Sequence, residues 1–173
     1  MLSNTKIIQE VLKENSILFK NMISDIKFNK KYSNLKKYKT IVIIGMGGSI
    51  LGTKAIHSFL KYKIKKKLIF LDNLDENYLK QIKKNKNLSK TLFLIISKSG
   101  NTDETILNMY FLKNFLKHNN TIILAENRDN FLRKIAIKNK HFFVNHNKLI
   151  GGRYSVLSNV GMLPAYLMDL KIE

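Results

Sequence analysis

Short runs of apolar residues alternate along the chain with longer segments in which apolar and charged residues recur at helical spacing. The runs are four to six residues long and contain few polar positions, which is typical of strands that helices cover on both faces. The alternation of such strands with helices predicts an α/β chain with a parallel sheet. The expected strands cover residues 40–44, 68–71, 91–96, 121–125 and 141–144.

The segments between these runs predict amphipathic helices, and two further helical patterns flank the set. We expect a three-layer α/β/α sandwich with a five-stranded parallel sheet, whose ligand lies beyond the carboxyl ends of the strands. Pro164 falls inside the last helical pattern, a position where proline can kink a helix. The expected helices cover residues 49–60, 75–83, 102–117 and 129–138, preceded by 3–26 and followed by 155–170.

The chain has 173 residues, enough for one domain with a hydrophobic core. No run approaches the roughly 18 apolar residues of a membrane helix, and Lys6, Glu10 and Lys13 stand where a signal peptide would be apolar. The absence of cysteine excludes disulfides and thiolate chemistry and fits a reducing compartment, so we expect a cytoplasmic protein. The four histidines show no metal-ligand spacing, and we expect neither a metal nor a cofactor.

The formal net charge of +19 suggests nucleic-acid binding as one function. Of the 31 basic residues, however, only Arg128, Arg133 and Arg153 are arginine, the residue that base reading and bidentate phosphate contacts favour. Lysine, asparagine and isoleucine together supply 70 residues, and all three have A/T-rich codons. Codon drift therefore accounts for the charge, and we expect no nucleic-acid partner. A positive field would still favour a small phosphate ester as ligand.

Residues 44–52 contain four glycines and join the first expected strand to a helix. Glycines let backbone N–H groups approach an anion closely, and a helix N-terminus adds partial positive charge, so phosphate is the expected ligand. The segment departs from the dinucleotide pattern GxGxxG at Ile50, and from the P-loop because Thr53 precedes Lys54. Asp72, at the end of the second expected strand, leaves dinucleotide binding open, and a tight structural turn is a further alternative.

Residues 97–105 follow the third expected strand and open the next helix. Three hydroxyl side chains, one ammonium group and a glycine stand within six residues, where the unpaired N–H groups of a helix point outward. This composition predicts an anion-binding loop. The alternative is ordinary helix capping, because Asn101 and Glu104 have the spacing of a capping box.

Residues 151–158 begin with a glycine pair that would let the loop pass close to a ligand. Arg153 follows the pair and offers a permanent cation able to stabilise a developing oxyanion. A surface arginine in a flexible turn is the alternative interpretation.

Residues 44–52, 96–105 and 151–161, in this order, resemble the phosphoglucose isomerase family, specifically its first sugar isomerase (SIS) domain. The resemblance implies a flavodoxin-like SIS fold over residues 1–173, with a helical lead-in over about 1–38. It also implies conversion between glucose 6-phosphate and fructose 6-phosphate through an enediolate, in glycolysis and gluconeogenesis, by a homodimer. It further implies that Ser97, Lys98, Ser99 and Thr102 bind the sugar phosphate, that Gly48, Ser49 and Gly152 line the same pocket, and that Arg153 stabilises the enediolate.

In this family the proton-transferring glutamate, a histidine that helps to open the ring and a late lysine lie in a second SIS domain and a C-terminal tail, beyond Glu173. We therefore expect the chain to be the sugar-phosphate-binding half of an isomerase, inactive by itself. Glu126, just after the fourth expected strand, is the one acidic side chain near the binding edge with freedom to reach a substrate. A noncatalytic SIS-domain sensor of sugar phosphates is the alternative, although such a sensor does not need residues 151–155.

Overall fold

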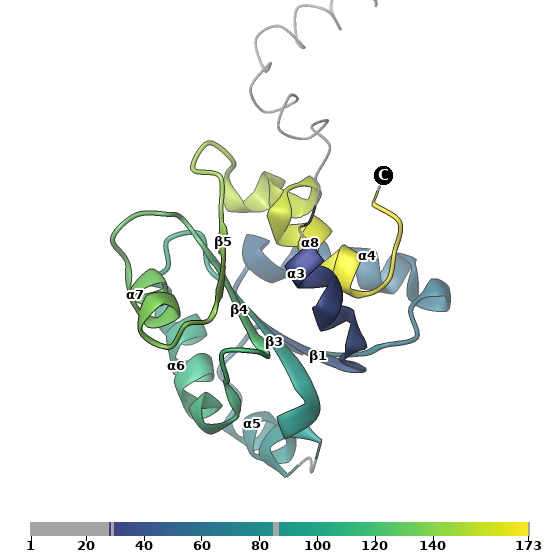
Figure 1. The fold of residues 1–173 in the computed structure, drawn as a ribbon, viewed down its shortest axis with the longest axis horizontal. Coiled ribbons are helices and arrows are strands. Elements are labelled where there is room, and N and C mark those ends of the chain that lie inside the picture. The colour runs from purple at the N-terminus through teal and green to yellow at the C-terminus, as the bar shows by residue number, and fades with distance from the viewer. Residues whose placement is uncertain (1–27, 29, 85–86, 173) are drawn as a thin grey trace, which may run out of the picture.

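Five parallel strands form one sheet in the computed structural model, which describes residues 28, 30–84 and 87–172 (Figure 1). The strand order is β2-β1-β3-β4-β5, and each pair is parallel. This confirms the expected α/β class and all five predicted strands; β2 begins one residue earlier and β5 begins and ends one residue later than the apolar pattern indicates. The strands are β1 (Thr40–Ile44), β2 (Lys67–Leu71), β3 (Thr91–Ile96), β4 (Thr121–Ala125) and β5 (Phe142–Asn145).

Helices cover both faces of the sheet and complete the predicted three layers (Figure 1). Helices α5, α6 and α7 pack on one face against the side chains of Val42, Phe93 and Ile123, among others. Helices α3, α4 and α8 pack on the opposite face, where Ile43 and Leu94 lie. The helices are α3 (Lys30–Ser33), α4 (Gly48–Phe59), α5 (Glu76–Lys83), α6 (Asp103–Phe111), α7 (Phe131–Lys138) and α8 (Asn159–Leu167).

Every residue of β3 and β4 is buried, which explains why these runs lack the alternation of a half-exposed strand. Successive side chains point to opposite faces, so each strand contributes to both halves of the core. Burying an isoleucine, leucine or phenylalanine side chain stabilises the fold by about 1.5–3 kcal/mol. Among the apolar residues of β3 and β4, each isoleucine, leucine and phenylalanine is buried in this way.

Two helix predictions differ from the structure by more than two residues at an end. The helix predicted over residues 102–117 stops at Phe111 and continues as the 3₁₀ turn η4 (Lys113–Phe115), because the amide of Leu112 already bonds the carbonyls of both Asn108 and Met109. The helix predicted over 155–170 is split into the 3₁₀ helix η5 (Gly152–Leu157) and α8. The helix predicted over 3–26 lies outside the described residues.

Pro164 lies inside α8 and is buried, and it cannot donate a bond to the carbonyl of Val160, four residues earlier. The hydroxyl of Thr53, on α4, instead lies 3.4 Å from that carbonyl oxygen. Thr53 is fully buried, so its hydroxyl supplies the hydrogen bond that this carbonyl could not receive from water. This contact joins α4 to α8 on the face of the sheet that carries the glycine-rich loop.

The sheet has a topological switch point between β1 and β3, because the chain leaves β1 for one neighbour and returns on its other side. Ligands of doubly wound sheets bind at this point, beyond the carboxyl ends of the strands. The loops after β1 and β3 are residues 45–47 and 97–102, the first two segments singled out in the sequence.

Candidate functional site

Three hydroxyl groups gather in the loop after β3. The Oγ of Ser97 lies 2.8 Å from Oγ1 of Thr102, and the Oγ of Ser99 lies 3.4 Å from each of these oxygens. Gly100 turns the loop with a φ of 71°, a conformation that favours glycine. The chain therefore folds back so that hydroxyls five residues apart in sequence form one cluster.

The alternative interpretation of this loop, a capping box at Asn101, is wrong. Thr102, rather than Asn101, is the N-cap residue of α6, and its side chain makes no capping bond because its hydroxyl faces Ser97. The Oδ1 of Asn101 accepts instead from the amide of Phe131, at the start of α7, over 2.9 Å. The first turn of α6 thus has no side-chain cap, which leaves its N–H groups available to an anion.

The glycine-rich loop and the third segment meet at Gly48 and Gly152. A Cβ on Gly48 would collide with the carbonyl group of Gly152, so glycine is needed here for close approach of two backbones. The hydroxyl of buried Ser155 lies 2.6 Å from the carbonyl oxygen of Gly152 and 3.2 Å from that of Gly48. Loops about one hundred residues apart are thereby fixed side by side.

These three loops enclose a cavity of about 440 Å³, which we call the first cavity. Six of the eight predicted site residues line it. Ser97 lies beneath it, 2 % exposed, and contributes through its bond to Thr102. Arg153 does not line it: its side chain is exposed, and its guanidinium carbon lies 5.4 Å from the ring centre of Tyr154. The lining residues are Met46, Gly48, Ser49, Lys98, Ser99, Thr102, Glu126, Arg128 and Gly152.

Three charged side chains meet at one wall of the first cavity. The carboxylate of Glu126 lies 2.7 Å from Nε of Arg128 and 3.7 Å from Nζ of Lys98. Lys98 also donates to the backbone carbonyl of Lys148 over 2.9 Å, so the ammonium group expected to be free has two partners. Two cations around one carboxylate leave a net positive wall, which suits an anionic ligand.

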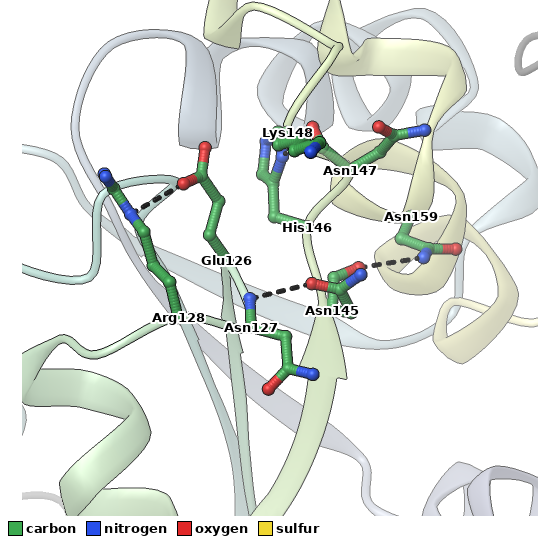
Figure 2. Close-up of a pocket in the computed structure, with 8 residues that line it drawn as sticks. All are labelled: Glu126, Asn127, Arg128, Asn145, His146, Asn147, Lys148 and Asn159. Atoms are coloured by element: carbon green, nitrogen blue, oxygen red, sulfur yellow. Dashed lines mark hydrogen bonds and ion pairs between the residues drawn. The ribbon is translucent and has the colours of Figure 1, made fainter.

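A second cavity, of about 620 Å³, opens beyond this wall (Figure 2). It shares Glu126 and Arg128 with the first cavity, and asparagine side chains from the ends of β4, β5 and α8 form much of the rest. Figure 2 shows two bonds that brace it: the amide of Asn127 donates to Oδ1 of Asn145 over 2.9 Å, and Nδ2 of Asn159 donates to the carbonyl of Asn145 over 3.2 Å. The lining residues are Glu126, Asn127, Arg128, Asn145, His146, Asn147, Lys148 and Asn159.

His146 belongs to the wall of the second cavity but is 2 % exposed. Burial lowers the pKa of its imidazole, so the ring is neutral at pH 7. Its Nδ1 lies 2.9 Å from the carbonyl oxygen of Asn147, to which it donates, and Nε2 has no hydrogen-bond partner among the described residues. A neutral ring in this position adds no charge to the cavity.

Asn130 fixes the loop after β4 to the start of α7. Its Oδ1 accepts from the amide of Arg133 over 2.9 Å, and its Nδ2 donates to the carbonyls of Glu126 and Arg128 over 2.9 and 3.0 Å. A Cβ on Gly100 would collide with this side chain, so the loop after β3 packs directly on it. The two loops that carry the charged wall are therefore held by one buried amide.

Met46 and Arg128 line the cavity but were not predicted from the sequence. Glu126 was expected to be free to reach a substrate, but it is bound by Arg128 and Lys98. Arg128 carried two signals that could have identified it: arginine is rare in this chain, and the residue stands three positions after the end of β4. Asp72 is the residue that left dinucleotide binding open in the sequence. Its Oδ2 lies 2.5 Å from Nζ of Lys54.

The fold is a doubly wound α/β domain with a polar, positively charged cavity at the switch point of its sheet. Comparison with known proteins is consistent with this class, since the model of the phosphoglucose isomerase family matches residues 4–169. The chain belongs to the phosphoglucose isomerase family.

Two relatives and one solved structure illustrate the similarity. The chain is 33% identical to a glucose-6-phosphate isomerase of Methanocaldococcus jannaschii over 96% of its own length and 42% of the relative's. It is 40% identical to a glucose-6-phosphate isomerase of Borreliella burgdorferi over 78% of its length and 27% of the relative's. A glucose-6-phosphate isomerase structure from Chlamydia trachomatis superposes with a TM-score of 0.64 at 24% identity, covering 92% of this chain and 29% of that one.

The chain thus spans less than half the length of these relatives. Among the helices of the described residues, none is both long enough and apolar enough to cross a membrane.

Proposed function

We propose that this chain is the sugar-phosphate-binding part of a glucose-6-phosphate isomerase, the enzyme that interconverts glucose 6-phosphate and fructose 6-phosphate. One observation carries the proposal: Gly48, Ser49, Lys98, Ser99, Thr102 and Gly152, drawn from three loops that lie far apart in the sequence, line one cavity at the carboxyl ends of parallel strands. The family membership supports the same assignment.

In this proposal the phosphate group binds the loop after β3. The hydroxyls of Ser99 and Thr102 donate to its oxygens, Ser97 orients Thr102 from beneath, and Lys98 supplies charge. Charge-assisted hydrogen bonds of this kind are the strong ones in proteins. Gly48, Ser49 and Gly152 form the wall along which the rest of the sugar extends.

Arg153 would stabilise the enediolate. It follows Gly152, which lines the cavity, and the proposal requires its side chain to leave the ring of Tyr154 and turn toward the cavity. A cation placed where negative charge develops lowers the barrier for proton abstraction next to a carbonyl.

We further propose that the chain alone does not catalyse the isomerisation. Moving a proton between C1 and C2 requires a base that is free to reach the substrate. Glu126 is the one carboxylate that lines the first cavity among the described residues, and it is bound by Arg128 and Lys98. In this proposal the proton-transferring carboxylate comes from outside the described residues, in a homodimeric enzyme of the cytoplasm. The lack of cysteine supports a reducing compartment.

Isothermal titration calorimetry tests the binding function. We expect saturable binding of glucose 6-phosphate and none of glucose, because the contacts are to the phosphate. Lys98→Gln is expected to weaken binding by about 1–2 kcal/mol. The matched control is Lys138→Gln, which removes the same charge from the last turn of α7, away from the cavity, and is expected to leave binding unchanged. Equal affinity for glucose, or no binding of either compound, would contradict the proposal.

A further inference from the structure

Arg128 stands at the boundary between the two cavities and lines both of them. Its side chain is 60% exposed, so the guanidinium group is accessible to a ligand. Its backbone is fixed: the amide donates to the carbonyl of Glu126 over 2.9 Å, and the carbonyl accepts from Nδ2 of Asn130 over 3.0 Å. A flexible side chain thus rises from a rigid turn beside the phosphate-binding loop.

Glu126 holds this side chain in one direction. Its carboxylate is only 12% exposed, and it contacts Nε of Arg128 through one oxygen and approaches Nζ of Lys98 through the other. Figure 2 shows the pair as a dashed line at the mouth of the second cavity. An arginine anchored through Nε keeps the N–H groups of both terminal nitrogens for another partner.

Glu126 is the one partner of the Arg128 guanidinium group in the described part of the chain, and it contacts Nε. Paired terminal N–H groups match the spacing of two phosphate oxygens, which is why arginine is favoured where phosphate is gripped in bidentate fashion. Lys98, the other cation of the first cavity, is shared with the carbonyl of Lys148 and offers only part of its charge.

We propose that Arg128, held in place by Glu126, is a second cation for the phosphate group bound in the first cavity. This proposal rests on the proposed function, because it assumes that a phosphate ester binds beside Ser99 and Thr102. It assigns Arg128 as a binding residue and Glu126 as a positioning residue that acts through Arg128 and Lys98.

The positioning role of Glu126 makes an unusual prediction about charge. If Glu126 acted only as a negative charge near the phosphate, Glu126→Gln would strengthen phosphate binding by removing a repulsion. If it positions the two cations, the same change weakens binding, although the protein becomes more positive. The sign of the effect separates the two roles.

Titration calorimetry with inorganic phosphate and with glucose 6-phosphate provides the test, on the 173-residue chain and four variants. Arg128→Gln is expected to weaken binding of both ligands about tenfold, the usual effect of one charge-assisted contact. Arg128→Lys is expected to fall between this variant and the unchanged protein, since it keeps the charge and loses the paired geometry. Glu126→Gln is expected to weaken binding. Thermal unfolding of each variant checks that it folds.

Arg133→Gln is the matched control. Arg133 lies on α7, lines neither cavity, and bonds Oδ1 of Asn127 through Nε. It carries the same charge at a similar place in the sequence, so a general electrostatic effect would weaken binding here as well. We expect a change of less than about twofold.

The outcomes are distinct. If the unchanged chain binds both ligands but Arg128→Gln binds them equally well, the assignment of Arg128 is wrong and the proposed function stands. If Arg133→Gln weakens binding as much as Arg128→Gln, the effect is net charge and the assignment is also wrong. Tighter binding by Glu126→Gln would overturn its positioning role. If the unchanged chain binds neither ligand, both this inference and the proposed function are wrong.

Discussion

At the scale of single residues, we predict that the hydroxyl cluster after β3 binds a ligand, since Thr102 makes no capping bond. Ser99→Ala combined with Thr102→Ala is expected to weaken binding of glucose 6-phosphate by about 1–3 kcal/mol, because two hydrogen bonds to a charged group are lost. The unfolding free energy should change by less than about 1 kcal/mol, since Thr102 makes no capping bond. Calorimetry and urea unfolding measure the two effects.

Ser158→Ala is the opposite control for this prediction. The Oγ of Ser158 accepts from the amide of Val160 and caps α8, and the residue lines neither cavity. We expect a loss of about 1 kcal/mol in unfolding free energy with unchanged binding. A Ser99 and Thr102 double variant that behaved like Ser158→Ala would show that the loop only caps its helix.

Two buried histidines predict a pH dependence of stability. Burial lowers the pKa of His141 and of His146 in the folded protein. In the unfolded chain both titrate near about pH 6.5, so below this pH the unfolded chain binds more protons than the folded one. The unfolding free energy should therefore fall as the pH drops below about 6.5 and be insensitive to these groups above it.

Urea unfolding at several pH values tests this dependence. His141→Gln is expected to flatten the decrease in unfolding free energy on the acid side, because one of the two groups no longer titrates. The comparison is His118→Gln: its ring is exposed, and it lowers the pKa of His141 only as a nearby charge, less than burial does, so we expect a smaller effect. If neither His141→Gln nor His146→Gln reduces the fall in unfolding free energy below about pH 6.5, other groups cause that fall.

At the scale of secondary-structure elements, one side chain holds the β4–α7 connection. Asn130 caps α7 and satisfies the carbonyls of Glu126 and Arg128 while being 3% exposed. Asn130→Ala is expected to lower the unfolding free energy by about 2–4 kcal/mol, because a cap is lost and two carbonyls lose their donor. Binding should weaken as well, since both residues of the charged wall lose their support.

Asp75→Ala is the comparison for this element. Asp75 caps α5 by accepting from the amide of Tyr78, but it is exposed, and its side chain makes no second hydrogen bond to any described residue. Its loss should cost about 1 kcal/mol in the same urea experiment and leave binding unchanged. Equal losses for Asp75→Ala and Asn130→Ala would mean that the carbonyls of Glu126 and Arg128 find other donors.

The accuracy of the sequence predictions follows the same division between elements and loops. The strands were predicted to within one residue because burial on both faces makes each one a continuous apolar run. Helix ends were less accurate because they depend on contacts between distant residues. Asn101 has capping-box spacing but bonds Phe131, and Ser158 interrupts the last helix by bonding the carbonyl of Ser155.

At the scale of the whole molecule, the site could be predicted because topology brings loops together. Three polar loops that follow parallel strands must meet at one edge of the sheet, and Gly48 and Gly152 do lie against each other. The charged wall could not be predicted, because its geometry depends on the direction in which Glu126 points. The partners of Lys98 and Arg128 are fixed by that single carboxylate and not by a sequence motif.

The same carboxylate decides the last prediction, that the purified chain binds glucose 6-phosphate but does not isomerise it. A base must be free to take a proton from C2, and Glu126 is held between two cations. An enediolate that cannot form cannot be stabilised by Arg153, so binding should survive while turnover is lost, as happens when groups that act as a unit are separated.

A coupled isomerase assay measures this, with a full-length glucose-6-phosphate isomerase as the positive control. We expect no turnover above background at protein concentrations that saturate the substrate in calorimetry. If the chain shows robust turnover, and this turnover is lost in Glu126→Gln but kept in Glu104→Gln, Glu126 is the base. The proposal that this chain binds the substrate without catalysing the reaction would then be wrong. Glu104 is the suitable comparison because it lies in the first turn of α6 and does not line the cavity.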